Sequence, residues 1–142
     1  MNTEDYVSLE VAKLLKEKGF REPCNAIYYV NRSGNSSLQI MFCLNEFEYL
    51  SKHNDGFQYE YLAPSLYEAQ KWLRNKHQLH ISVGMCSDYS TNADGEICDE
   101  WNFWSFSTYY TTSLYHIHDY VEEYDSYEEA LNAGILEALK LI

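Results

Sequence analysis

The sequence predicts an α+β protein in which an antiparallel sheet of four or five strands carries three helices, mainly on one face. Three segments have the apolar spacing of amphipathic helices, and runs rich in β-branched and aromatic residues lie between them. The connections favour antiparallel pairing, and the expected order is helix, two strands, helix, two or three strands, helix. The length of 142 residues fits one domain spanning residues 1–142.

The helix termini are marked by local capping residues. The first helix is expected to follow Ser8 and to end at Gly19, because glycine adopts the left-handed conformation without steric cost. The second begins at Ser65, whose hydroxyl and the Glu68 carboxylate can form the two halves of a capping box. The third begins at Ser126 and repeats this pattern.

The third helix also carries the most complete apolar stripe, with residues recurring at offsets of three and four over 127–142. Gly134 lies within that stripe. Glycine inside a helix costs about 1 kcal/mol relative to alanine. The position of Gly134 on the apolar face therefore predicts close packing of this helix against the sheet.

Strands are predicted from apolar and aromatic runs bounded by turn residues. The expected strands cover residues 26–31, 38–44, 79–83 and 103–110, with a short fifth strand at 115–121. Ser33-Gly34-Asn35 predicts a hairpin between the first two, and Asp94-Gly95 ends a polar stretch before the fourth. Residues 45–63 are expected to form a loop that wraps the sheet.

The net charge of −12 excludes several classes of function. Sequence-independent nucleic-acid binding and docking on anionic lipid both require a basic face. The acidity is concentrated: residues 1–76 hold 10 acidic and 9 basic side chains, whereas residues 77–142 hold 12 acidic side chains and only Lys140. No run is long enough for a membrane span and no apolar signal core follows Met1, so a cytoplasmic location is expected.

The four cysteines predict reduced thiols rather than a metal site. They form no C-x-x-C pair, so no structural zinc is expected, and no other cofactor is indicated by a motif. Cys24 and Cys43 lie in apolar runs and are expected to pack as small core residues. Cys86 and Cys98 flank a predicted turn and could face each other across a hairpin, although two free thiols are the preferred interpretation.

Three segments resemble a known group of proteins. They are Glu10 to Phe20 followed by Glu22-Pro23-Cys24, Ala63 to Arg74 continuing to His80-Ile81, and Tyr124 to Ile135. These segments are similar to small uncharacterised proteins of phages and mobile elements of gut bacteria, and they cover under half of the chain. The resemblance implies a small accessory protein acting in a bacterial cell, and it transfers no functional residue.

A metal-dependent enzyme is the lowest-ranked function. His116 and His118 lie two residues apart on a predicted strand and, with Glu122 or Glu123, could bind a divalent cation. The sequence has no third histidine nearby, no nucleophile elbow and no phosphate-binding glycine loop. An exposed polar strand end is therefore the preferred interpretation of the histidine pair.

The densest aromatic cluster lies between residues 101 and 110. Both alternating sets of this strand carry aromatic rings, but only one face of the sheet can point at the helices. Some rings are therefore expected to meet a partner chain or to line a binding surface. The preferred function is a non-enzymatic binding module for a protein partner, either a basic host factor or a second copy. The candidate partner-binding residues are Trp101, Trp104, Tyr109, Tyr110, Glu122 and Glu123.

The alternative is a protein that binds or sequesters a small anionic ligand such as a nucleotide. Phosphate groups require cationic side chains, and these lie almost entirely in the first half of the chain. The candidate ligand-binding residues are Arg21, Arg32, Lys71, Arg74 and Lys76.

Overall fold

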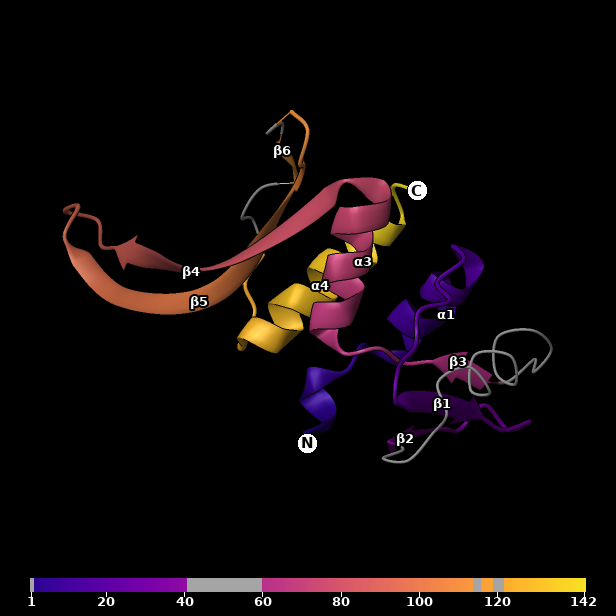
Figure 1. The fold of residues 1–142 in the computed structure, drawn as a ribbon. Helices are drawn as coiled ribbons and strands as arrows, with labels where there is room; N and C mark the ends of the chain where they lie inside the picture. The colour runs from indigo at the N-terminus through magenta and orange to yellow at the C-terminus, as the bar shows by residue number, and fades with distance from the viewer. Residues whose placement is uncertain (1, 41–59, 114–115, 119–121) are drawn as a thin grey trace.

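The computed structural model describes residues 2–40, 60–113, 116–118 and 122–142, and it confirms the α+β class. Figure 1 shows how the helices lie between two separate sheets. A short 3-10 helix, Thr3–Asp5, precedes the other elements. The helices are α1 Leu9–Glu17, α3 Leu66–His77 and α4 Tyr127–Leu139. The strands are β1 Ala26–Val30, β2 Ser36–Ile40, β3 Glu60–Leu62, β4 Leu79–Thr91, β5 Ile97–Tyr110 and β6 His116–His118.

The strands form two three-stranded antiparallel sheets, whereas one sheet was expected. Their orders are β2-β1-β3 and β4-β5-β6. Strand β3 lies in the stretch 45–63 that was expected to be a loop, of which residues 45–59 are outside the described part. Main-chain pairing of Glu60 with Tyr29 holds β3 in place. The strand could not be predicted, because three residues are too few to show an alternation of apolar and polar side chains.

The predicted caps of α1 and α3 are confirmed. The Ser8 hydroxyl accepts a hydrogen bond from the Val11 amide, and Gly19 has the expected positive φ of 87°. At α3, the Ser65 hydroxyl accepts from the Glu68 amide while the Glu68 carboxylate accepts from the Ser65 amide, which completes the capping box. Local sequence alone therefore determines where these helices begin.

Helix α4 also begins at its predicted cap, with one difference. The Ser126 hydroxyl accepts from the Glu129 amide, but the Glu129 carboxylate accepts from the amide of Asp125 instead of Ser126. Gly134 lies on the buried face as predicted. A Cβ atom at this position would lie 2.5 Å from Cγ2 of Ile81 and 3.1 Å from the Phe106 ring, so the helix backbone rests directly on β4 and β5.

Helix α4 lies at the centre of the core. It contacts α1 and α3 on its sides and packs on β4 and β5 of the second sheet. Its buried residues Ile135, Ala138 and Leu139 join one apolar cluster that includes residues of α1, α3 and both sheets. The Asn132 side chain also ties α4 to the start of α1, since its Oδ1 accepts from the Ser8 amide at 2.9 Å.

The β4–β5 hairpin is much longer than predicted. The expected strands at 79–83 and 103–110 extend to Leu79–Thr91 and Ile97–Tyr110. The predicted turn at Asp94-Gly95 is confirmed: Gly95 has a φ of 82°, and the Asn92 side chain accepts from the amides of Asp94 and Glu96. The polar stretch 88–95 lay outside the predicted strands. Cross-strand main-chain pairing extends β4 into it, because this pairing does not depend on the polarity of the side chains.

Candidate binding surfaces

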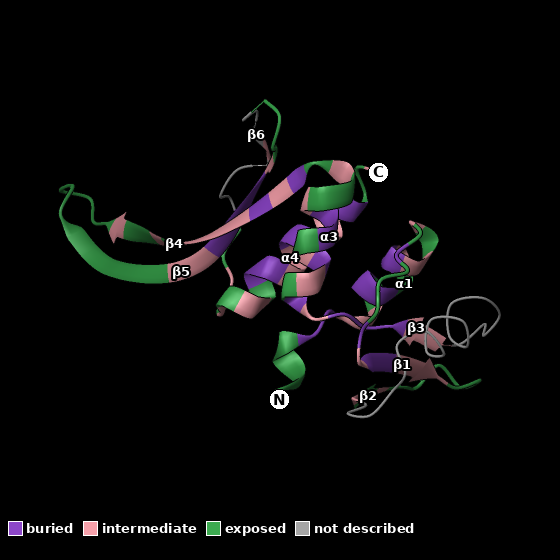
Figure 2. Ribbon diagram, viewed as in Figure 1, coloured by how far each residue is buried: buried purple, intermediate pink, exposed green. Residues whose placement is uncertain are grey.

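The outer part of the β4–β5 hairpin projects beyond the helices that cover its base. We call residues 85–102 the arm. Figure 2 shows that the arm is mainly exposed, and every residue from Thr91 to Asn102 is exposed. The arm consists of two strands without a third strand or helix packed on it in the described part of the chain. Two-stranded ribbons are only marginally stable in water, so an arm of this length is a surface suited to contact another molecule.

The arm is acidic and partly apolar. It contains no lysine or arginine. Its acidic residues are Asp88, Asp94, Glu96, Asp99 and Glu100. Large apolar side chains are also exposed on it, and these are Met85, Tyr89, Ile97 and Trp101. A surface with this composition complements a basic partner that also carries apolar groups.

The structure brings Trp101 together with Glu123, although 22 residues separate them. The Trp101 Nε1 donates a hydrogen bond of 3.2 Å to Glu123 Oε1, and 39% of the tryptophan surface remains exposed. Both Glu122 and Glu123 are exposed. An indole next to exposed carboxylates can accept a cationic side chain over its face while the carboxylates pair with the same charge.

The other candidate aromatic residues are partly occupied by contacts within the chain. Trp104 is half-buried, and its ring meets the ring of Tyr127 of α4 at a centroid distance of 5.5 Å. Tyr109 is half-buried and lies 5.2 Å from the ring of His80. Tyr110 is 40% exposed at the base of the hairpin. Trp101 is therefore the aromatic residue of this set that belongs to the arm and remains open to a partner.

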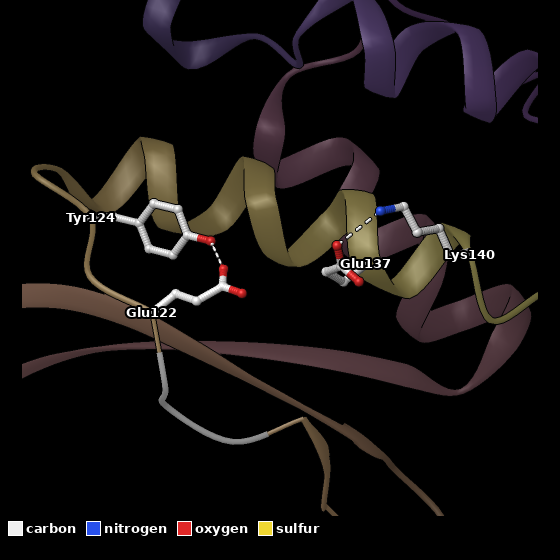
Figure 3. A network of polar contacts seen from close by, with 4 residues as sticks. All are labelled: Glu122, Tyr124, Glu137 and Lys140. Carbon is white, nitrogen blue, oxygen red and sulfur yellow. Dashed lines mark hydrogen bonds and ion pairs between the residues drawn. The ribbon is translucent and has the colours of Figure 1, made fainter.

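A polar network supports the segment that carries the two glutamates. Figure 3 shows the Tyr124 hydroxyl donating to the Glu122 carboxylate, next to the ion pair of Lys140 Nζ and Glu137 Oε1 at 3.0 Å. Burial, together with the hydrogen bond to the Glu122 carboxylate, raises the pKa of Tyr124. The Tyr124 backbone pairs in both directions with that of Trp104. Glu122 is therefore held at a fixed place beside β5.

No family model, curated protein or solved structure matches this chain. The function must therefore be inferred from the surfaces of the chain itself. Within the described residues, none of the helices combines the length and apolar content needed to cross a membrane.

The candidate ligand-binding cations do not form one group. Lys71 and Lys76 of α3 line a pocket of about 320 Å³ together with Trp72 and Asn75. Glu22, Pro23 and Glu68 complete its lining. Arg74 lies on α3 outside this pocket, near enough to His80 that its charge, added to the effect of burial, lowers the pKa of that histidine.

Two further arginines are placed elsewhere. Arg21 is exposed in the connection that follows α1, and Arg32 is exposed in the turn between β1 and β2. Neither lines the pocket beside α3. Sequence inspection did not identify this pocket, because Glu22 and Pro23 reach α3 only through the tertiary fold.

The histidine pair lies on β6, where His118 pairs with Thr108 and His116 with Tyr109 of β5. The side chains of both histidines are outside the described part of the structure. Among the residues that are described, no three His, Cys, Asp or Glu side chains lie close enough to hold a metal ion. The metal site considered at His116 and His118 lies outside the part of the structure in which side chains are described.

The cysteine thiols have different environments. Cys86 is opposite Phe103 in the hairpin, whereas Cys98 lies near the turn, so the two do not face each other and are free thiols. Burial raises the pKa of the Cys24 thiol to about 12, which keeps it protonated and unreactive at neutral pH. Cys43 is outside the described residues.

Proposed function

We propose that this protein is a non-enzymatic binding module that engages a basic protein partner through the arm and the adjoining residues Glu122 and Glu123. The observation that carries the proposal is the arm itself, which exposes aromatic and acidic side chains and no cation. The setting proposed from the resemblance is a bacterial cell, in which the protein serves a phage or mobile element and the partner is a host factor.

The chemistry of the contact follows from the surroundings of Trp101. Its indole is exposed and anchored by Glu123, Asp88 is its cross-strand partner, and Asp99 lies two residues before it on the same face of the strand. An exposed tryptophan surrounded by carboxylates is suited to an arginine or lysine, because cation–π attraction and ion pairing act on the same group. Tryptophan is also among the residues that most often dominate the energy of protein interfaces.

The proposal is tested by comparing two double variants with the same change of charge. Asp88→Asn/Asp99→Asn neutralises two acids on the same face as Trp101, and the control Glu10→Gln/Glu17→Gln neutralises two exposed acids of α1. Proteins retained from a bacterial lysate by the immobilised wild type are identified by mass spectrometry at low and high salt. We expect a basic protein whose retention falls at least about tenfold with the arm variant or with high salt, and remains with the control.

The Trp101→Ala variant supplies an independent check on the same partner. We expect truncation of an interface tryptophan to weaken binding by about 2 kcal/mol or more, measured by titration calorimetry with the purified partner. A partner that binds the arm variant, the Trp101 variant and the wild type equally would contradict the proposal. Retention that is insensitive to salt would contradict it as well.

The second candidate function, binding of a small anionic ligand, is favoured by the pocket beside α3. Lys71 and Lys76 supply positive charge and the edge of Trp72 supplies an apolar contact. If this pocket binds nucleotides, a nucleotide panel should raise the melting temperature of the wild type and leave that of Lys71→Gln/Lys76→Gln unchanged. Unshifted melting curves across the panel would remove this candidate.

A further inference from the structure

Strand β4 is an edge strand, and the pattern of hydrogen bonds shows which of its main-chain groups point outward. In an antiparallel strand, the main-chain amide and carbonyl of one residue point to one edge of the strand, and those of the next residue point to the other edge. The Gln78 carbonyl accepts from the Thr111 amide on the β5 side, whereas the Ile81 carbonyl accepts from Gln70 of α3 on the other side. The even-numbered residues of β4 therefore bond to β5, and the odd-numbered residues face outward.

The pairing of Trp104 confirms this assignment. Trp104 is directly opposite Met85, yet both of its main-chain groups bond to Tyr124 on the far side of β5. Met85 and Trp104 are therefore a pair without mutual hydrogen bonds, and the amide and carbonyl of Met85 point away from β5. The amide of Tyr89 likewise bonds to the Asp88 side chain at 2.8 Å instead of joining the ladder.

The open part of this edge runs from Val83 to Tyr89. Gln70 covers the edge at Ile81. Beyond it, the outward groups of Val83, Met85 and Ser87 have no partner within the described part of the chain. Soluble proteins protect such edges with lysine, proline or a short strand. Residues 79–91 contain no lysine, arginine or proline and a single charge, Asp88, and their Met85 and Tyr89 side chains are more than half exposed.

We infer that this edge pairs antiparallel with β4 of a second copy of the chain, which joins the two β4-β5-β6 sheets into one sheet of about six strands. The four outward residues Val83, Met85, Ser87 and Tyr89 are centred on Cys86. A two-fold axis at Cys86 places Val83 opposite the second copy's Tyr89 and Met85 opposite its Ser87. This register uses the whole open edge and avoids the part that Gln70 covers.

Opposite charges at the two ends of β4 favour antiparallel pairing with a second copy of the chain. Antiparallel pairing directs the tip of each arm, with Asp94 and Glu96, toward the start of the second copy's β4. That strand begins directly after the last turn of α3, which holds Arg74, Lys76 and His77. The symmetry creates this acid–base contact twice. Parallel pairing would instead align the two acidic tips, which repel each other.

The inference concerns the outward main-chain groups of β4 at residues 83–89, whereas the contact proposed for the basic partner centres on the Trp101 side chain of β5 and residues 122–123. The oligomeric state and the binding of the partner are therefore measured separately. The inference is tested by two proline variants. Ser87→Pro removes an outward amide from the proposed interface. Its cross-strand partner Asn102 carries an outward amide on the opposite edge of the same hairpin, so Asn102→Pro is the matched control.

The oligomeric state is measured by light scattering and analytical ultracentrifugation. We expect the wild type and Asn102→Pro to have twice the monomer mass of 16.7 kDa, and Ser87→Pro to be a monomer at the same concentration. Circular dichroism establishes that each variant is folded. A wild type that remains monomeric up to about 1 mM would overturn the inference, and so would a folded Ser87→Pro variant that remains dimeric.

Oxidative cross-linking tests the register without relying on a proline. Residues at the two-fold axis form a pair without mutual hydrogen bonds, with Cα atoms about 4.5 Å apart, which a disulfide can span. Copper-catalysed air oxidation of the two Cys86 thiols should give a linked dimer on a non-reducing gel. The dimer should be absent with Cys86→Ser and persist with Cys98→Ser. A linked dimer that persists in Cys86→Ser would overturn the proposed register.

Discussion

Replacing Phe106 with alanine is expected to lower the free energy of unfolding by about 3–5 kcal/mol. The side chain is fully buried beneath α4. Its ring would be 3.1 Å from a Cβ at Gly134, and it lies 6.0 Å from the ring of Tyr124. Truncation therefore leaves a cavity where the central helix rests on the second sheet. Urea denaturation followed by circular dichroism measures the change.

Phe103→Ala is the matched control for this prediction. Phe103 lies on the same strand, three residues away and on the opposite face of the sheet, where it is only half-buried. Its truncation removes the same number of atoms but less buried area, so we expect a loss of about 1–2 kcal/mol. Equal losses for the two variants would contradict the assignment of Phe106 to the centre of the core.

Gly134→Ala is expected to lower the free energy of unfolding by about 1–2 kcal/mol, although alanine is the better helix former. The helical preference of alanine contributes about 1 kcal/mol in its favour. The added methyl would lie 2.5 Å from Cγ2 of Ile81, whose side chain is fully buried in the core. Overpacking of this kind costs about 1–3 kcal/mol, and at this separation we expect it to exceed the helical gain.

A double-mutant cycle isolates that contact. Ile81→Ala removes Cγ2 and is destabilising by itself, by about 2–5 kcal/mol. In the Ile81→Ala background the closest clash of the methyl at position 134 is gone and only the tight contact with the Phe106 ring at 3.1 Å remains, so Gly134→Ala should be close to neutral there. The expected coupling between the two positions is about 2 kcal/mol, measured from four denaturation curves. Additive effects would contradict the close approach of α4 to β4.

The features that could be predicted from sequence depend on neighbouring residues. Ser8, Ser65 and Ser126 mark helix starts because a cap bonds to an amide only three residues away. Gly134 indicated a close approach because its position in an apolar stripe is a local property. The α+β class followed from the same short-range patterns.

The features that could not be predicted depend on distant pairing. The β4–β5 hairpin exceeds its predicted length because main-chain bonds maintain the exposed arm without an alternating pattern of apolar residues. The bond between Trp101 and Glu123, and the approach of Pro23 to α3, require the folded chain. The open edge of β4 is indicated in the sequence by one feature, which is the lack of lysine, arginine and proline over residues 79–91.

The central position of α4 has a consequence for synthesis of the protein. Every other described element precedes α4 in the chain, yet α4 is the element on which α1, α3, β4 and β5 all pack. Until the ribosome releases residues 127–139, the apolar face formed by Ile81 and Phe106 has no helix to cover it. Nascent chains are therefore expected to expose that face to chaperones, and to become resistant to protease only after α4 has docked.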